Sequence, residues 1–132
     1  MEPIPFGWHD LACDDVARAA DFYAATFGWQ CRAARANGGV YHRLSIGGRD
    51  VASLYRISAP ANANRLRPHW TSYICVSSVD ESAATAVRVG GTVLVRPFNV
   101  VDDSKAPVAR IALIADPQGA TFGLWEGPLP PA

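Results

Sequence analysis

The sequence predicts an α+β fold made of two tandem βαβββ modules in one domain. A short apolar run is followed at once by a helix with one apolar stripe and then by three extended runs. The same order of segments recurs further along the chain, which indicates an internal duplication. At 132 residues the chain can bury one core, but it is too short for two independent domains.

The first module is predicted over about residues 5–57. An apolar run at 6–13 predicts its first strand, and Asp15 is the expected N-cap of the following helix. The apolar stripe of that helix and its glycine stop are Val16, Ala20, Tyr23, Phe27 and Gly28. Turn residues then separate three expected strands, which lie at 30–36, 40–46 and 51–57.

The second module is predicted over about residues 69–127, after a linker at 58–68 without usable periodicity. Its expected elements are a strand at 71–77, a helix from Asp80 toward Val89, and strands at 93–96, 109–115 and 121–126. Residues 97–107 are expected to form a mobile loop that could act as a lid. The run from Asp116 to Gly119 predicts a tight hairpin. An offset of 65 residues superposes the starts of the two modules and places Trp8 on Tyr73.

The balance of charge limits the kinds of partner. Twelve basic residues match twelve acidic ones, so the chain lacks the positive field typical of proteins that bind nucleic acids or anionic membranes. No stretch resembles a signal peptide or a membrane-spanning helix. We therefore expect a cytoplasmic protein with a small-molecule partner. The three cysteines have no disulfide or metal-binding spacing, and buried thiols are expected at Cys13, Cys31 and Cys75.

Two groups of residues carry a resemblance to a known family. The first group is Trp8-His9-Asp10-Leu11 with Asp15, Asp21-Phe22-Tyr23 and Phe27-Gly28-Trp29, and the second is Ala115 to Ala120 with Phe122-Gly123-Leu124. In this order they resemble the vicinal oxygen chelate superfamily, which includes glyoxalase I, bleomycin-resistance proteins, fosfomycin-resistance enzymes and extradiol dioxygenases. The resemblance implies the glyoxalase/bleomycin-resistance fold, in which two modules form a cupped mixed sheet around a small molecule. It also implies a homodimer.

Metal-dependent members of that superfamily hold their ion at four positions, one on the first and one on the last strand of each module. By the resemblance these positions are Trp8, Ser53, Tyr73 and Gly123. They lack the anionic or imidazole donors that a divalent cation needs, so neither a metal nor another cofactor is expected. A shift of one residue would bring His9 into the first position. This leaves open a metal-dependent lyase or dioxygenase with a shifted ligand set.

Asp10 is the candidate catalytic group. Alternation along a strand places it on the same side as Trp8, where a carboxylate in an apolar cup would serve as an acid or base. The alternative is a solvated or ion-paired residue at the strand end. Tyr73 is its expected polar helper, because a hydroxyl can bond a carbonyl or phenol of the ligand. The expected ligand-binding residues are Trp8, Ser53, Tyr73, Gly123 and Trp125, whose aromatic rings would stack on a planar molecule.

Three functions remain open at this stage. The first is a protein that binds a small aromatic or drug-like molecule in the cup without a metal. The second is a metal-independent isomerase, cyclase or lyase that uses Asp10 for proton transfer. The third is a scaffold whose cup is filled by its own side chains.

Overall fold

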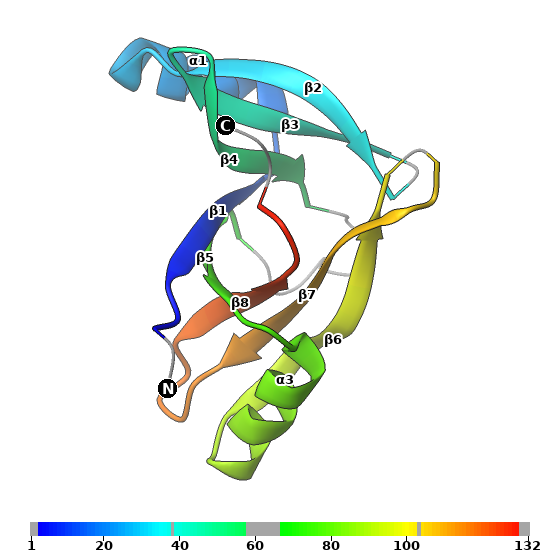
Figure 1. The fold of residues 1–132 in the computed structure, drawn as a ribbon. Helices are drawn as coiled ribbons and strands as arrows, with labels where there is room; N and C mark the ends of the chain where they lie inside the picture. Colours follow the sequence, from blue (N-terminus) through cyan, green and yellow to red (C-terminus); the bar gives the residue numbers. More distant parts are fainter. Residues whose placement is uncertain (1–2, 38, 58–66, 103, 130–132) are drawn as a thin grey trace. The chain divides into compact units, whose positions relative to one another are not determined.

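The computed structural model describes residues 3–37, 39–57, 67–102 and 104–129. It has the predicted α+β architecture, with two βαβββ modules that each contain one helix and a four-stranded mixed sheet (Figure 1). By their contacts the described residues divide into two compact units, one from within 9–70 and the other from within 3–8 and 71–129. The predicted linker falls almost entirely on residues 58–66, which lie outside the described residues.

Module one has the predicted order of elements. They are β1 (Phe6–Cys13), α1 (Val16–Phe27), β2 (Gln30–Ala36), β3 (Gly39–Ile46) and β4 (Arg49–Arg56). The strands lie in the order β2-β3-β4-β1, with antiparallel pairing from β2 to β4 and parallel pairing between β4 and β1. Helix α1 begins after Asp15, whose carboxylate accepts a hydrogen bond from the amide of Arg18, and it ends at Gly28 in the left-handed conformation.

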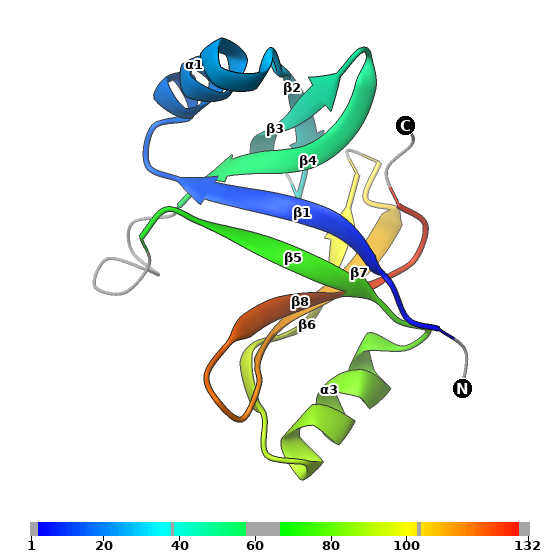
Figure 2. The same ribbon diagram turned by 90° about the vertical axis from the view of Figure 1, so that its left-hand side faces the viewer.

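Helix α1 packs on one face of the module-one sheet (Figure 2). Leu44 and Leu54 have no exposed surface and form the centre of this core. Because successive side chains of a strand point to opposite faces, their neighbours Arg43 and Ser53 lie on the face opposite α1. The positions of the core residues therefore determine which polar residues lie together on the face opposite α1.

Module two repeats the plan with its own core. Its elements are β5 (His69–Cys75), α3 (Val79–Arg88), β6 (Thr92–Val101), β7 (Pro107–Ala115) and β8 (Thr121–Glu126). The strands lie in the order β5-β8-β7-β6, and β5 pairs in parallel with β8. Val79 and Ala83 of α3 pack with Ala112, Ile114 and Leu124 of the sheet. The face of this sheet opposite α3 therefore holds Tyr73 and Gly123, which alternate with these core residues.

Helix α3 starts earlier than expected. Its N-cap is Ser78, whose hydroxyl accepts a hydrogen bond from the amide of Glu81, whereas the sequence predicted a start at Asp80. The Glu126 carboxylate of β8 accepts a second hydrogen bond from the amide of Val79 at 2.8 Å. The two helix caps, Asp15 and Ser78, are thus 63 residues apart, so the predicted offset of 65 is wrong by two residues.

The predicted lid is also wrong, because residues 97–101 continue strand β6. Phe98 pairs with Ile111 of β7, and the pairing extends to Val101. Pro97 falls within a register shift between Val95 and Phe98 on the edge strand. Edge strands and bulges are the places in a sheet that tolerate a proline, which is why the strand can pass through it.

The hairpin between β7 and β8 confirms the turn prediction. The Asp116 carboxylate accepts hydrogen bonds from the amides of Gln118 and Ala120, both at 2.9 Å. Gly119 has a φ of 91°, a conformation that strains residues with a side chain. Local turn chemistry is therefore sufficient to fix this connection.

No helix in the described part of the chain is long and apolar enough to cross a membrane. The three cysteines are free thiols, and burial raises the pKa of Cys13, Cys31 and Cys75. Thiols with a raised pKa stay protonated at neutral pH and are poor nucleophiles.

Candidate functional site

The polar side chains of module one gather on the sheet face opposite α1. Asp10 of β1 is the register partner of Ser53 of β4, and Ser53 is the register partner of Arg43 of β3. Tyr55 follows two residues after Ser53 on the same strand and so lies on the same face. We call this surface the polar face and define it by Asp10, Arg43, Ser53 and Tyr55. All four residues are half-buried, so each keeps some exposed surface.

Tyr55 and Asp10 influence each other electrostatically. Burial, followed by the negative charge of Asp10, raises the pKa of Tyr55 to about 12. The phenol is therefore a firmly protonated hydrogen-bond donor beside a carboxylate.

Arg43 is held in place by two hydrogen bonds. Its Nε donates to the hydroxyl of Tyr41 at 2.9 Å, and its Nη1 donates to Oδ2 of Asp50 at 2.9 Å. Arg32 of β2 donates to the same Asp50 oxygen at 2.6 Å. The Asp50 side chain is only 6% exposed, compared with 19% for Arg43 and 57% for Arg32. Two guanidinium groups therefore share one carboxylate, and this end of the sheet carries an excess positive charge.

Module two places aromatic rings where module one has polar groups. Tyr73 of β5 is the register partner of Gly123 of β8 and is 3% exposed. The ring of Tyr73 covers Gly123 so closely that a Cβ at that glycine would lie 2.3 Å from the Tyr73 Cδ2. The Trp125 ring lies edge-on to Tyr73 at 5.8 Å between centroids, and Trp8 lies 6.4 Å from Trp125. We call Trp8, Tyr73 and Trp125 the aromatic cluster.

The helix caps show which positions of the two modules correspond. Asp10 and Tyr73 each lie five residues before their cap, Asp15 and Ser78, and each pairs in parallel with the last strand of its module. Asp10 and not Trp8 is thus the counterpart of Tyr73. The wrong start of the second helix displaced only the position counted for module two, so the counterpart of Trp8 is Thr71 and not Tyr73.

The corrected positions still do not fit a divalent metal ion. Trp8, Ser53, Thr71 and Gly123 include an indole, two hydroxyls and a residue without a side-chain donor. No group of three or more histidine, cysteine, aspartate or glutamate side chains in the described residues is arranged to hold a metal.

The histidines lie apart from this face. His9 is exposed, His69 forms a hydrogen bond with the carbonyl of Arg67, and His42 is half-buried on the α1 side. The Nδ1 of His42 has no hydrogen-bond partner among the residues that the structure describes. Within those residues, nothing brings the three histidines together as metal ligands.

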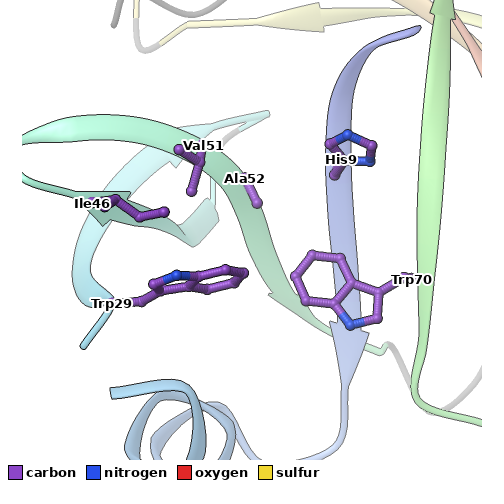
Figure 3. A pocket seen from close by; sticks show the side chains of 6 residues that line it. All are labelled: His9, Trp29, Ile46, Val51, Ala52 and Trp70. Carbon is purple, nitrogen blue, oxygen red and sulfur yellow. The ribbon is translucent and has the colours of Figure 1, made fainter. Parts of the chain in front are cut away.

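An apolar pocket of about 340 Å³ lies in the compact unit of residues 9–70 (Figure 3). Its lining residues are His9, Trp29, Ile46, Val51, Ala52 and Trp70. The rings of Trp29 and Trp70 are perpendicular, with 6.3 Å between centroids, and the Trp70 indole donates to the hydroxyl of Tyr23 at 3.1 Å. Of the site residues considered from the sequence, only His9, the ligand of the shifted metal alternative, lines this pocket. These contacts join Trp70 at the start of β5 to Tyr23 of α1 and to Trp29, and we assign the pocket no ligand.

Sequence reasoning missed Arg43, Asp50 and Tyr55. Tyr55 could have been found, because it lies two residues after Ser53 and alternation puts both on one face. Arg43 required the register of β3 on β4, which shifts between Leu44 and Ser45. A register shift of this kind has no signature in the local sequence.

The fold and the site positions together define a glyoxalase-like domain. The model of the family described as "Glyoxalase-like domain" matches residues 8–125, so the chain belongs to this family, within the vicinal oxygen chelate superfamily. The resemblance of the two motif groups to the vicinal oxygen chelate superfamily is thereby confirmed.

Curated relatives and solved structures agree with this assignment. The chain is 33% identical over 121 residues to CFP32 of Mycobacterium tuberculosis (strain CDC 1551 / Oshkosh), whose name marks it as a candidate glyoxylase; the match covers 90% of this chain and 44% of CFP32. It is 33% identical over 130 residues to "Anthracycline biosynthesis protein DauV" of Streptomyces sp. (strain C5), with 90% of this chain and 46% of DauV covered. The chain thus spans less than half the length of these relatives.

One similar solved structure is a variant of the Streptomyces coelicolor methylmalonyl-CoA epimerase in complex with 2-nitronate-propionyl-CoA. It is 20% identical to this chain, with a TM-score of 0.61, and the match covers 94% of this chain and 97% of the epimerase chain. A hypothetical protein, BH1468 from Bacillus halodurans C-125, is 14% identical, with a TM-score of 0.64 and 99% of both chains covered. At these identities the likeness concerns the fold, and it confirms the predicted glyoxalase-type fold.

Proposed function

We propose that this glyoxalase-like protein binds a small aromatic molecule at the polar face of module one without a metal ion. The observation that carries the proposal is the register pair of Asp10 and Ser53 on the sheet face opposite α1. This face presents a carboxylate, a hydroxyl and the protonated phenol of Tyr55, all suited to hydroxyl or carbonyl groups of a ligand.

The relatives support this choice of ligand. DauV is named for anthracycline biosynthesis, and anthracyclines are fused-ring aromatic compounds. The epimerase structure was solved with a bound small molecule. Trp8, Tyr73 and Trp125, with Gly123 beneath the Tyr73 ring, stay a separate proposed contact surface for an aromatic ring within their own unit, because planar rings bind well against tryptophan and tyrosine.

The test is calorimetric titration of protein treated with EDTA, using 2-naphthol and 1,4-naphthoquinone as probes. We expect saturable binding that the chelator does not change. Asp10→Asn and Ser53→Ala should each weaken binding by about tenfold, because each removes a hydrogen-bonding group from the face. Asp21→Asn, which alters an exposed carboxylate of α1, is the control and should bind as the unaltered protein does. Binding that requires added metal, or no binding of either probe, would overturn the proposal.

A second function rests on the proximity of Asp10 and Tyr55. A carboxylate next to a protonated phenol is a pair that can take up one proton and donate another, as an isomerase, cyclase or lyase requires. Tyr73 was the helper expected from the sequence, and it stays a candidate. If a substrate is found, Asp10→Asn should abolish turnover while binding survives; turnover that persists in this variant would exclude Asp10 as the base.

The proposed assembly and location are a homodimer in the cytoplasm, without nucleic-acid or membrane partners. Light scattering coupled to gel filtration tests the first point, and cell fractionation tests the second. A monomer, or a protein recovered outside the cytoplasm, would contradict the respective proposal.

A further inference from the structure

The charges of the polar face are unequally distributed. Arg32 and Arg43 together face the single carboxylate of Asp50, which leaves one positive charge in excess at the β2–β3 side. Asp10 places a negative charge on β1, on the other side of Ser53. Neighbouring strands lie about 4.8 Å apart, so the backbones of Arg43 and Asp10 are separated by roughly 10 Å. The face thus has a positive end and a negative end, with a hydroxyl between them.

The Arg43 side chain is held by a hydrogen bond to Tyr41 in addition to its ion pair with Asp50. Its hydrogen bonds to Tyr41 and Asp50 hold the guanidinium plane and use two of the five N–H groups that an arginine offers. An ion pair needs one arginine for one carboxylate, and Arg32 already supplies it at 2.6 Å. A fixed, partly exposed guanidinium with remaining donors is the arrangement that recognises a carboxylate.

From this arrangement we propose that the ligand of the polar face is an aromatic molecule that carries both a carboxylate and a hydroxyl group. The carboxylate contacts Arg43, and the hydroxyl donates to Asp10 while bonding Ser53. The negative charge of Asp10 repels the carboxylate from the other end, so the charges fix one orientation of the molecule. This inference rests on the proposed function and specifies the ligand class of the same site.

Four matched probes test the inference by calorimetric titration: 6-hydroxy-2-naphthoic acid, its methyl ester, 2-naphthoic acid and 2-naphthol. We expect the hydroxy acid to bind about tenfold more tightly than its ester, because only the acid gives Arg43 a charged acceptor. Arg43→Gln should remove this advantage, so that the acid and its ester bind with equal affinity. Asp10→Asn should instead remove the advantage of the hydroxy acid over 2-naphthoic acid.

The matched control is Arg56→Gln, which removes the same charge from an exposed residue of β4 on the other face of the sheet. It should leave all four affinities unchanged. If Arg43→Gln fails to fold, Arg43→Lys and Arg32→Gln decide instead. The lysine keeps the charge without the planar fork, and the loss of Arg32 frees Asp50 to neutralise Arg43, so both should reduce the preference for the acid.

The outcomes separate the inference from the proposed function. Equal affinity for the acid and its ester, or a preference that survives in the Arg43 and Arg32 variants, overturns the assignment of the carboxylate while aromatic binding stands. Failure of all four probes to bind overturns both proposals.

Discussion

In module one, the paired positions on the first and last strands hold Asp10 and Ser53, whereas in module two they hold Tyr73 and Gly123. The backbone pairing is the same, since both pairs are parallel and both first members lie five residues before a helix cap. Small polar side chains leave the first pair half-buried, while the Tyr73 ring covers the glycine of the second. One repeated backbone therefore supports a polar surface in one module and close aromatic packing in the other.

This difference teaches that the same site positions can serve two physical purposes. In module two, the large ring and the missing side chain complement each other in volume, as residues of a core do. In module one, half-buried charged and hydroxyl groups form a polar surface. Substitutions at the equivalent register pairs should therefore have different consequences. We expect loss of stability at the pair in module two and loss of ligand binding at the pair in module one.

The largest expected effect is that of Gly123→Ala. The added Cβ would lie 2.3 Å from Cδ2 of Tyr73, so the ring must move out of its place. Overpacking of this kind should lower the free energy of unfolding by about 2 kcal/mol, measured by urea denaturation. Tyr73→Leu in the same background should restore part of the loss, because it makes room for the methyl group.

Ser53→Ala is the matched change in module one, since it adds no atom and should cost less than about 1 kcal/mol. Equal losses from Gly123→Ala and Ser53→Ala would contradict the contrast between the two modules.

The next effect concerns the helix caps, where the modules also differ. The N-terminus of α1 is capped by Asp15, whereas α3 is capped by both Ser78 and Glu126. Asp15→Ala should therefore destabilise the protein by about 1 kcal/mol, and Ser78→Ala by about half as much, because Glu126 still holds an amide of the first turn. The double variant Ser78→Ala, Glu126→Ala should lose about 2 kcal/mol in urea denaturation. A Ser78→Ala loss as large as that of Asp15→Ala would show that Glu126 does not support the cap.

These caps also show which parts of the fold could be predicted from the sequence. Helix α1 and the hairpin at Asp116 follow from residues within a few positions of each other, and both were predicted correctly. Ser78 and Asp80 are both acceptable cap residues by local rules, and the structure uses Ser78 together with Glu126, which lies 47 residues beyond the Val79 amide that it binds. A contact over that separation has no local signature, so the error in helix start passed on to the site positions.

The candidate site was predictable only in part for the same reason. Asp10 and Ser53 could be proposed from motif spacing and strand alternation. Their neighbour Arg43 depends on a register shift between β3 and β4, and its fixed geometry depends on Asp50 beyond the turn. Residues joined by strand register become neighbours only in the folded sheet.

A smaller effect tests whether Asp10 and Tyr55 interact. The pKa of Tyr55 is raised to about 12, first by burial and then by Asp10. Below about pH 10, near the ordinary tyrosine pKa, the protonated phenol contributes its full stabilisation, which is lost as the pH rises from about 10 to about 12. Asp10→Asn should lower the pKa of Tyr55 without returning it to the ordinary value, because burial remains.

The ultraviolet absorbance of tyrosinate follows this titration, with Tyr55→Phe to assign the signal and Asp21→Asn as the control. A Tyr55 titration that is the same in Asp10→Asn and in the unaltered protein would show that the two groups do not interact.

The smallest effect belongs to the exposed ion pair of module two. Arg110 donates two hydrogen bonds to Asp80, at 2.8 and 2.9 Å, and these bonds lower the pKa of the Asp80 carboxyl. A lowered pKa means that the stabilisation is present above the ordinary aspartate value of about 4 and is lost as the pH falls below it. Asp80→Asn should thus flatten the pH dependence of the free energy of unfolding, measured by urea denaturation, below about pH 4, and Arg110→Gln should do the same.

Arg88→Gln, a control at the other end of α3, should leave the acid dependence unchanged. Because solvent screens exposed pairs, added salt should remove the difference between the Asp80→Asn variant and the unaltered protein; a difference that persists at high salt would place the origin of the acid sensitivity elsewhere.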